Sequence, residues 1–276
     1  MKLLTALISF YMAFAICLIS QAQDPMIEHL QNLSVQVVSE GASGSGVIFH
    51  RDIPIKGENK TKRVYFVWTN AHVVAGSRHI LEKENGDKTI HFNYPRIKRC
   101  IFENGIITGC KYYKTKIIAY SDYTTGHDLA ILMILDEDFK CEESVEFDYK
   151  DIPKAGQYIW HIGSFLGDAG SGSFSDGCIS QIGRILMNNP FIGTFFDQVS
   201  CTAFPGSSGG GVFRGDGENK GKCIGLLSRQ RAETFNYIIP ARRMFLFCED
   251  NHLMWTIDKN STMPYLNDFN KILLDE

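Results

Sequence analysis

The sequence predicts an all-β fold, and three observations support this prediction. Twelve short segments rich in β-branched, aromatic and aliphatic residues have the length of strands, and clusters of Gly, Asp, Asn and Lys separate them. These segments form two groups of about six, divided near residues 142–154. No convincing helix is predicted before about Pro240. Regular spacing of this kind is typical of β-sandwiches or β-barrels.

The predicted strands of the first group cover residues 34–39, 45–50, 63–69, 88–94, 115–121 and 128–135. Those of the second group cover residues 158–164, 178–184, 195–202, 210–213, 222–228 and 235–239. After Pro240, two short helices are predicted at 241–248 and 265–274. Residues 51–62 are polar and predict a surface connector, whereas the Gly- and Ser-rich segment 165–177 is either a connector or a loop near a binding cleft.

The composition indicates a folded protein that does not bind nucleic acid in a general way. Of the 276 residues, 44% are hydrophobic and 21% are charged, so a packed core is expected and disorder is not. The net charge is −3. A nucleic-acid-binding surface needs an excess of basic residues, which this balance does not offer.

The amino-terminal segment predicts export. Lys2 precedes an almost wholly apolar run at residues 3–19, and Ser20-Gln21-Ala22 places small residues where a signal peptidase cleaves. We therefore expect a signal peptide at residues 1–22 and a secreted or periplasmic protein. An uncleaved signal anchor is the less favoured alternative, since 17 apolar residues just span a bilayer. No other segment is long and apolar enough for a membrane span.

Cleavage would remove Cys17 and leave seven of the eight cysteines. This odd number predicts at least one free thiol even in an oxidising compartment. Cys100 and Cys110 flank a turn signal at residues 103–105, so a disulfide across a hairpin is plausible. No CxxC pair and no Cys/His cluster with zinc spacing is present, so a structural metal is not expected.

Three segments carry side chains suited to nucleophilic catalysis. His72 follows a strand-like run at the start of a turn, Asp128 enters a strongly apolar strand, and Ser208 lies in the Gly-rich turn 205–211. A carboxylate beside an apolar strand is costly unless another group pairs with it. A serine hydroxyl is a weak nucleophile that needs a hydrogen-bonded base, and the base needs a partner that fixes its tautomer. The three segments could supply all of these groups.

In this order the segments resemble the trypsin-like (chymotrypsin-fold) serine peptidases, and most nearly the protease domain of the HtrA/Deg type. Further motifs agree with this resemblance over about residues 34–246, and they are found at residues 44–49, 115–134, 161–167, 179–184, 223–226 and 236–241. The resemblance implies two six-stranded antiparallel β-barrels with the active site between them.

The resemblance also assigns roles to individual residues. It makes His72 the general base, Asp128 its orienting partner and Ser208 the nucleophile of a serine endopeptidase that forms an acyl-enzyme. The backbone N–H groups of Gly206 and Ser208 would form the oxyanion hole. His127 is expected to be a non-catalytic neighbour, because adjacent strand residues point to opposite faces. This mechanism needs no cofactor and no metal. Protein or peptide substrates are implied, whereas the oligomeric state is not.

Substrate binding is expected along the strand after the nucleophile and in the segment before it. The substrate backbone would pair near Leu227, Ser228 and Arg229, and Thr202, Phe204 and Leu227 would wall the specificity pocket. None of these pocket residues is acidic, so a preference for Arg or Lys is disfavoured and a modest apolar pocket is expected. The basic cluster of Arg229, Arg231, Arg242 and Arg243 is predicted to be solvated surface.

The predicted organisation has four parts. A signal peptide (1–22) precedes an amino-terminal barrel (23–145), a carboxy-terminal barrel (146–246) and a tail (247–276) packed on the barrels. Only 35 residues follow Ala241, which is too few for a PDZ domain. Two other functions compete with the peptidase: a catalytically silent relative that binds proteins as a chaperone or adhesion module, and an enzyme that cleaves esters.

Overall fold

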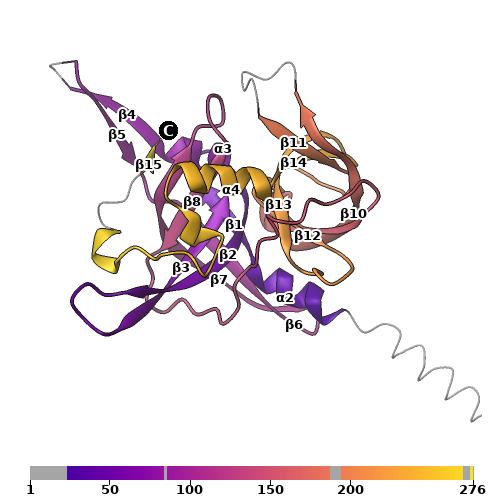
Figure 1. Cartoon of the computed structure of the whole chain (residues 1–276), viewed down its shortest axis with the longest axis horizontal. Helices are drawn as coiled ribbons and strands as arrows, with labels where there is room; N and C mark the ends of the chain where they lie inside the picture. Colours follow the sequence, from indigo (N-terminus) through magenta and orange to yellow (C-terminus); the bar gives the residue numbers. More distant parts are fainter. Residues whose placement is uncertain (1–23, 84–85, 187–193, 270–273, 276) are drawn as a thin grey trace, which may run out of the picture.

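The computed structural model describes residues 24–83, 86–186, 194–269 and 274–275, and shows two β-barrels side by side (Figure 1). The first sheet has the strand order β15-β7-β6-β1-β2-β3-β8, and an added β7–β8 pairing closes six of its strands into a ring. The second barrel closes in the order β10-β11-β14-β13-β12-β9. The pairings within each ring are antiparallel, so the predicted chymotrypsin-like fold is confirmed.

The strands of the first ring are β1 (Ser34–Ser39), β2 (Ala42–Pro54), β3 (Thr61–Thr69), β6 (Arg96–Glu103), β7 (Ile106–Ser121) and β8 (Leu129–Ile134). Those of the second barrel are β9 (Tyr158–Phe165), β10 (Gly170–Ile185), β11 (Phe195–Val199), β12 (Gly211–Arg214), β13 (Cys223–Ala232) and β14 (Phe235–Pro240). The other elements are α2 (Pro25–Leu33), α3 (Ala71–Val74), α4 (Ala241–Asp250), β4 (Arg78–Glu82), β5 (Lys88–Phe92), β15 (Leu274–Asp275) and the 3-10 helices η1 (Ala75–Ser77), η2 (Gly167–Ala169), η3 (Met254–Thr256) and η4 (Leu266–Asp268).

Helix α2 corrects the expectation of no helix before Pro240. Its first turn is capped by Asp24, whose carboxylate accepts the Met26 N–H at 3.0 Å, and Pro25 occupies the first helical position. Leu30 and Leu33 are fully buried on the face that packs against the barrels. The predicted signal peptide at residues 1–22 lies outside the described residues. Among the residues that are described, none belongs to a helix long and apolar enough to cross a membrane.

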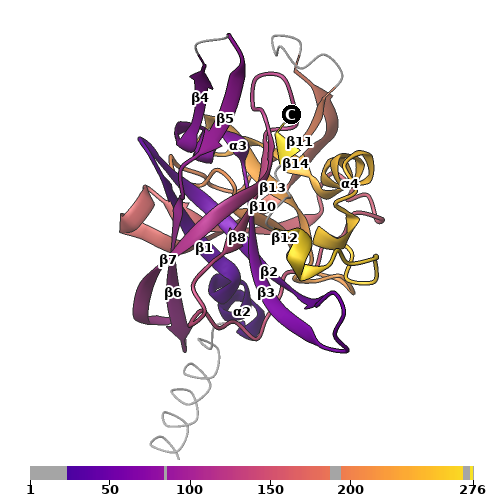
Figure 2. The ribbon, with the colours of Figure 1, turned by 90° about the vertical axis from the view of Figure 1, so that its left-hand side faces the viewer.

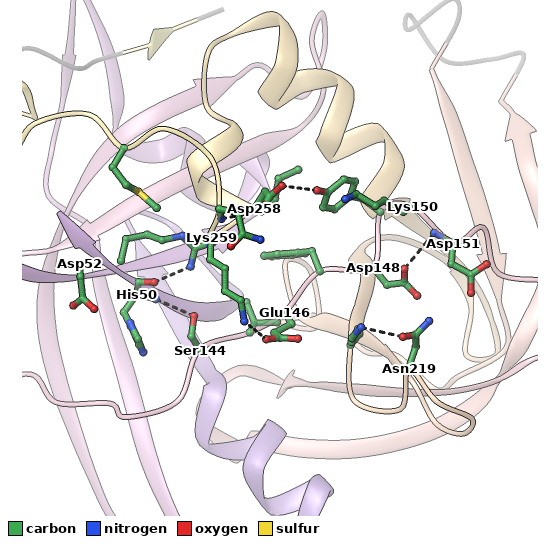
Figure 3. Close-up of a pocket in the computed structure, with 18 residues that line it drawn as sticks. His50, Asp52, Ser144, Glu146, Asp148, Lys150, Asp151, Asn219, Asp258 and Lys259 are labelled. Atoms are coloured by element: carbon green, nitrogen blue, oxygen red, sulfur yellow. Dashed lines mark hydrogen bonds and ion pairs between the residues drawn. The ribbon is translucent and has the colours of Figure 1, made fainter. Parts of the chain in front are cut away.

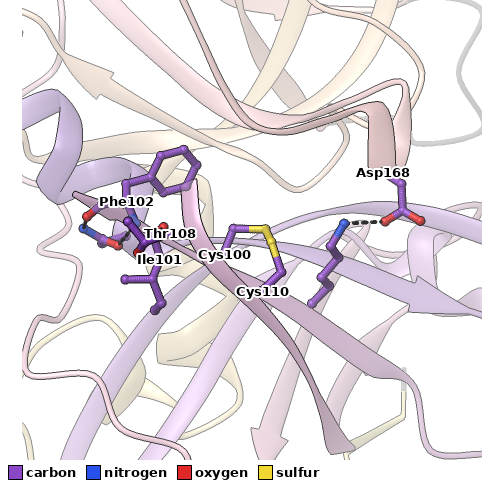
Figure 4. The surroundings of a disulfide bond; sticks show 8 residues. Cys100, Ile101, Phe102, Thr108, Cys110 and Asp168 are labelled. Atoms are coloured by element: carbon purple, nitrogen blue, oxygen red, sulfur yellow. Dashed lines mark hydrogen bonds and ion pairs between the residues drawn. A yellow bond between two sulfur atoms is a disulfide. The ribbon is translucent and has the colours of Figure 1, made fainter. Parts of the chain in front are cut away.

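One of the six strands predicted for the first barrel lies outside that barrel in the structure. The segment 88–94 was expected in the barrel, but β5 pairs only with β4, in a separate hairpin that projects beyond the first barrel (Figures 1 and 2). The barrel position belongs to β6, which pairs with β7 in a register that sets Cys100 opposite Cys110. These two cysteines form a disulfide with their Cα atoms 4.1 Å apart, as predicted (Figure 4).

The polar segment 51–62 and the Gly- and Ser-rich segment 165–177 both contain strand residues. β2 extends to Pro54 and β3 begins at Thr61, so the connector is shorter than predicted. β10 begins at Gly170 and packs against the first barrel: the Gly172 carbonyl accepts a hydrogen bond from the buried Gln31 amide at 2.9 Å. A Cβ at Gly172 would lie 2.3 Å from the Phe102 ring. The Gly-rich composition therefore reflects close packing of strands rather than a loose connector.

The carboxy-terminal residues pack on the first barrel. Trp255 is 3% exposed, and its ring lies 5.1 Å from that of Phe66 and 6.5 Å from that of Phe49. The Arg51 guanidinium donates to the Trp255 carbonyl at 2.6 Å. The predicted helix at 241–248 is confirmed as α4. The described part of 265–274 contains no α-helix, and it forms the 3-10 helix η4 and the first residue of the short strand β15 instead.

Helix α4 lies where the two barrels meet (Figure 1). Phe247 packs on Trp68 of the first barrel, and the Arg243 guanidinium donates to the His127 carbonyl at 2.9 Å. Arg242 forms a two-pronged ion pair with the fully buried Asp197, both bonds being 2.6 Å long. The prediction of a solvated basic cluster is therefore wrong for these two arginines, which hold α4 on the barrels.

We expect Trp255→Ala to destabilise the whole protein, because the tail is part of the first barrel's core. Truncating a buried tryptophan leaves a cavity and costs about 3–5 kcal/mol in free energy of unfolding, measurable by urea denaturation. Tyr265→Ala, which truncates an aromatic side chain of the same tail that is 46% exposed, should cost less than about 1 kcal/mol. Equal effects of the two substitutions would show that the tail is not integral to the core.

Candidate active site

His72 and Asp128 face each other at the end of the first barrel. β3 ends at Thr69, Asn70 is the residue before the one-turn helix α3, and His72 is the second residue of that helix. His72 Nδ1 lies 2.9 Å from Asp128 Oδ2, and the His72 backbone N–H donates to Oδ1 at 3.0 Å. A carboxylate can only accept these bonds, so Nδ1 carries the proton of the neutral ring and Nε2 keeps its lone pair.

Asp128 is held by both barrels. Its side chain is 3% exposed, and its backbone has a φ of 58°, an uncommon conformation for a residue other than glycine. The Asn70 amide donates to the Asp128 carbonyl at 3.2 Å. From the second barrel, the Ser228 hydroxyl donates to Oδ2 at 2.9 Å. The buried carboxylate is therefore well supplied with hydrogen bonds, as its removal from water requires.

The Gly-rich turn before β12 has a shape that only glycine permits. Gly206 has a φ of 96°, and a Cβ there would lie 2.3 Å from the Ser164 carbonyl oxygen. Gly209 has a φ of 84°, and its Cβ would lie 2.2 Å from the Ser45 carbonyl oxygen. Both positive φ angles and both close approaches exclude a side chain. Inside the turn, the Ser207 N–H donates to the Phe204 carbonyl at 2.9 Å.

The turn places Ser208 beside the loop of His72. The Ser208 carbonyl accepts the Ser45 N–H at 2.7 Å. A Cβ at Gly44 would lie 2.8 Å from that same carbonyl oxygen and 2.5 Å from the side chain of Val73, the neighbour of His72. Ser208 is half-buried. Within the described parts of the chain, its hydroxyl makes no hydrogen bond, to His72 or to any other group.

The backbone around Ser208 leaves two donors unused. The N–H of Gly209 donates to the Leu227 carbonyl at 2.8 Å, and that of Gly210 donates to the Ser207 carbonyl at 2.9 Å. By contrast, the N–H groups of Gly206 and Ser208 bond to no acceptor among the residues that the structure describes. Two backbone donors of one turn, both without an acceptor and one of them on the serine itself, can bind an anionic oxygen.

The predicted substrate-binding residues have diverse environments. Leu227 is buried in the core of the second barrel, and the Ser228 hydroxyl is occupied by Asp128, so neither side chain is open to solvent. The Phe204 ring lies 6.0 Å from that of Phe165. The Thr202 carbonyl accepts the Ser175 hydroxyl at 2.7 Å. Arg229 is half-buried, with its guanidinium 5.5 Å from the Phe196 ring.

Two further residues, Ser228 and His161, support this site in ways that the sequence pattern does not predict. Ser228 is predicted from the sequence to lie on the strand that pairs with substrate. In the structure its hydroxyl donates a hydrogen bond to the Asp128 carboxylate. His161 begins the motif at residues 161–167, and in the structure it is fully buried beneath the serine turn. The Gly211 carbonyl lies 3.0 Å from His161 Nδ1, and the imidazole stacks on Phe165 with ring centroids 5.3 Å apart. The bonds from Ser228 to Asp128 and from His161 to Gly211 join residues 100 and 50 positions apart in the sequence, which no local pattern reports.

A cavity of about 720 Å³ lies away from these residues, between the segment after β8 and the tail (Figure 3). Its charged groups are largely paired: Lys259 with Glu146 at 2.8 Å, and Tyr149 with Asp258 at 2.9 Å. His72, Asp128 and Ser208 are not among its lining residues.

Comparisons with known proteins agree with this fold. The family model of the trypsin-like peptidase domain matches residues 44–226. The serine endoprotease from Yersinia pestis is 16% identical with a TM-score of 0.54, the match covering 85% of this chain and 68% of that one. The HtrA-type protease AlgW with tripeptide is 19% identical with a TM-score of 0.53, covering 83% of this chain but only 62% of that one. At these identities the likeness shows the fold. No curated protein matches the sequence.

His161 should make the protein less stable in mild acid. Burial lowers its pKa from about 6.5 to about 4, the bond to Gly211 opposing this shift. Between these pKa values the unfolded chain binds a proton at His161 and the folded chain does not. The free energy of unfolding therefore falls as the pH drops from 6.5 towards 4. Between pH 7.5 and pH 5 this group removes about 2 kcal/mol of the free energy of unfolding. Urea denaturation at both pH values measures the loss.

The comparison needs His161→Gln, which keeps a polar side chain but cannot titrate, and His91→Gln as a control at an exposed histidine. The first variant should lose less stability than the wild type between the two pH values, and the control should lose as much. A loss in His161→Gln as large as in the wild type would contradict the assignment.

Proposed function

Since the chain belongs to the trypsin-like peptidase family, we propose that it is a serine endopeptidase that works through His72, Asp128 and Ser208. The family match spans all three residues. The single observation that supports the proposal most is the pair His72–Asp128, with Nδ1 and Oδ2 2.9 Å apart and the serine turn adjoining it. The buried carboxylate fixes the tautomer that a general base requires.

In the proposed mechanism, substrate binding brings the Ser208 hydroxyl within hydrogen-bonding distance of His72 Nε2. His72 Nε2 takes the Ser208 proton as the hydroxyl attacks the peptide carbonyl, and Asp128 stabilises the imidazolium that forms. The same proton then passes to the leaving amine. Water activated by His72 hydrolyses the acyl-enzyme and regenerates Ser208. Hydrogen bonds of this kind are often long or absent in a free enzyme and tighten once substrate binds.

The unused N–H groups of Gly206 and Ser208 support an oxyanion hole in this proposal. In the tetrahedral intermediate the carbonyl oxygen gains a negative charge, and donors already in place stabilise it without reorganisation. Two donors that no protein group occupies suit this role.

We further propose that the protein acts on exported protein or peptide substrates. An extended substrate would pair with β13 just after Leu227, near Ser228 and Arg229. Phe204 and Phe165 offer an aromatic wall beside the turn, and neither Thr202 nor Phe204 carries a negative charge. Apolar residues before the scissile bond are thus favoured over Arg or Lys. Secretion or periplasmic location depends on the predicted signal peptide, and a signal anchor is the alternative.

A fluorophosphonate probe tests the proposal, because it reacts covalently only with an activated serine. The wild-type protein should be labelled and should cleave members of a diverse peptide library. Ser208→Ala should abolish labelling, and His72→Ala or Asp128→Asn should lower kcat by about 10⁴-fold or more. Circular dichroism of each variant checks that the fold is retained.

The outcomes separate the competing functions. Folded wild-type protein without Ser208-dependent labelling contradicts the peptidase and favours a silent protein-binding module. Labelling combined with turnover of esters but of no peptide in the library favours an esterase that uses the same chemistry.

A further inference from the structure

Ser45 belongs to the first barrel, yet three of its hydrogen bonds reach the second. It lies on β2 and is fully buried. Its backbone N–H donates to the Ser208 carbonyl at 2.7 Å. Its hydroxyl lies 2.6 Å from the Gly206 carbonyl oxygen and 2.7 Å from the Ser164 nitrogen. Ser45 thus contacts both residues proposed for the oxyanion hole, from the opposite barrel.

The chemistry of the partners fixes the direction of each of these bonds. The Ser164 N–H can only donate, so it donates to the Ser45 oxygen. The hydroxyl has one proton, and the Gly206 carbonyl can only accept, so the proton points at Gly206. Within the described residues, the Gly206 carbonyl accepts no other hydrogen bond. The same peptide unit is also held at its other end, where the Ser207 N–H donates to the Phe204 carbonyl at 2.9 Å. Ser45 therefore supplies the bond that holds the carbonyl of this unit, and that bond comes from the first barrel.

That carbonyl belongs to the peptide unit that joins the two proposed donors. The Gly206 N–H belongs to the preceding unit, whose Pro205 carbonyl is held by the Leu166 N–H at 2.8 Å. The Ser208 N–H belongs to the following unit, whose Ser207 carbonyl is held by the Gly210 N–H at 2.9 Å. Ser45 holds the unit between them. Since the torsions of Gly206 are soft, the Ser45 bond to the carbonyl acts together with the Phe204 bond to the Ser207 N–H to set the angle between the two donor N–H groups.

Ser45 is also tied to the strand that leads to His72. The Thr69 hydroxyl donates to the Ser45 carbonyl at 2.7 Å, and Thr69 is the last residue of β3, three positions before His72. One residue of β2 therefore touches both the turn of the proposed nucleophile and the strand that carries the proposed base.

We propose that Ser45 is a positioning residue: its hydroxyl aligns the Gly206 and Ser208 N–H groups for the oxyanion. This inference rests on the proposed peptidase function. It implies that the oxyanion hole of the second barrel forms only when the first barrel is docked against it. Ser45 itself does not contact the reacting atoms, so its loss should weaken the transition state and spare substrate binding.

The test is Ser45→Ala, with Ser34→Ala as the matched control. Ser34 is a buried serine of the same barrel whose hydroxyl has no partner among the described residues. Misaligning one oxyanion donor should lower kcat by about 10–100-fold, somewhat less than its complete removal, while KM changes by less than about threefold. Affinity for a peptide aldehyde, which forms the tetrahedral oxyanion, should fall in parallel with kcat/KM. The control should keep wild-type kinetics.

Amide hydrogen exchange gives a second readout that does not need activity. In Ser45→Ala, peptides covering residues 203–210 should exchange faster, and peptides from β7 and β8 should be unchanged. Unchanged kcat and unchanged exchange at 203–210 would overturn the proposal. So would a rise in KM alone, or faster exchange throughout the first barrel, since either indicates a purely structural serine.

The two proposals fail in different ways. Wild-type protein that is folded but shows no Ser208-dependent labelling contradicts the peptidase function. In that case the exchange at residues 203–210 still decides whether the Ser45 hydroxyl holds the turn.

Discussion

The buried carboxylate of Asp128 is the interaction on which the arrangement of the site depends. It accepts two hydrogen bonds from His72 on α3 and one from Ser228 on β13, so both barrels converge on one side chain. A charge removed from water is tolerated only where such partners surround it. The two barrels therefore have to be docked before Asp128 is fully hydrogen-bonded, and the same docking brings the serine turn to His72.

Contact between the barrels also restricts which residues can form the serine turn. The Ser45 carbonyl oxygen of the first barrel approaches Gly209 so closely that no side chain fits, and within the second barrel the Ser164 carbonyl oxygen does the same at Gly206. The glycines that make this contact possible also make the turn soft, because they adopt many conformations at little cost. Hydrogen bonds from outside the turn compensate for that softness. Leu166 supplies one and Leu227 supplies two from the second barrel, and Ser45 supplies two from the first.

Local pattern was enough to place most strands but not the contacts between distant segments. The strand β1 matches its predicted bounds, and β9 and β14 differ by one residue, because turn residues punctuate these runs. β6 was missed because Arg, Lys and Cys interrupt its apolar residues. His72, Asp128 and Ser208 could be proposed from their motifs, whereas the roles of Ser45 and Ser228 could not. Each of these two serines bonds a partner more than 90 positions away, which periodicity does not encode.

Helix α4 shows how the fold balances the charge of Asp128. Arg243 is 2% exposed, and burial lowers its pKa to about 10, so it stays protonated at neutral pH. The attraction of Asp128 opposes that shift. Its guanidinium lies 4.8 Å from the Phe196 ring and donates to the carbonyl of His127, the residue before Asp128. Helix α4 thus adds a favourable charge interaction to the hydrogen bonds that hold Asp128. The site consequently draws on three parts of the chain: the first barrel, the second barrel and the helix that follows them.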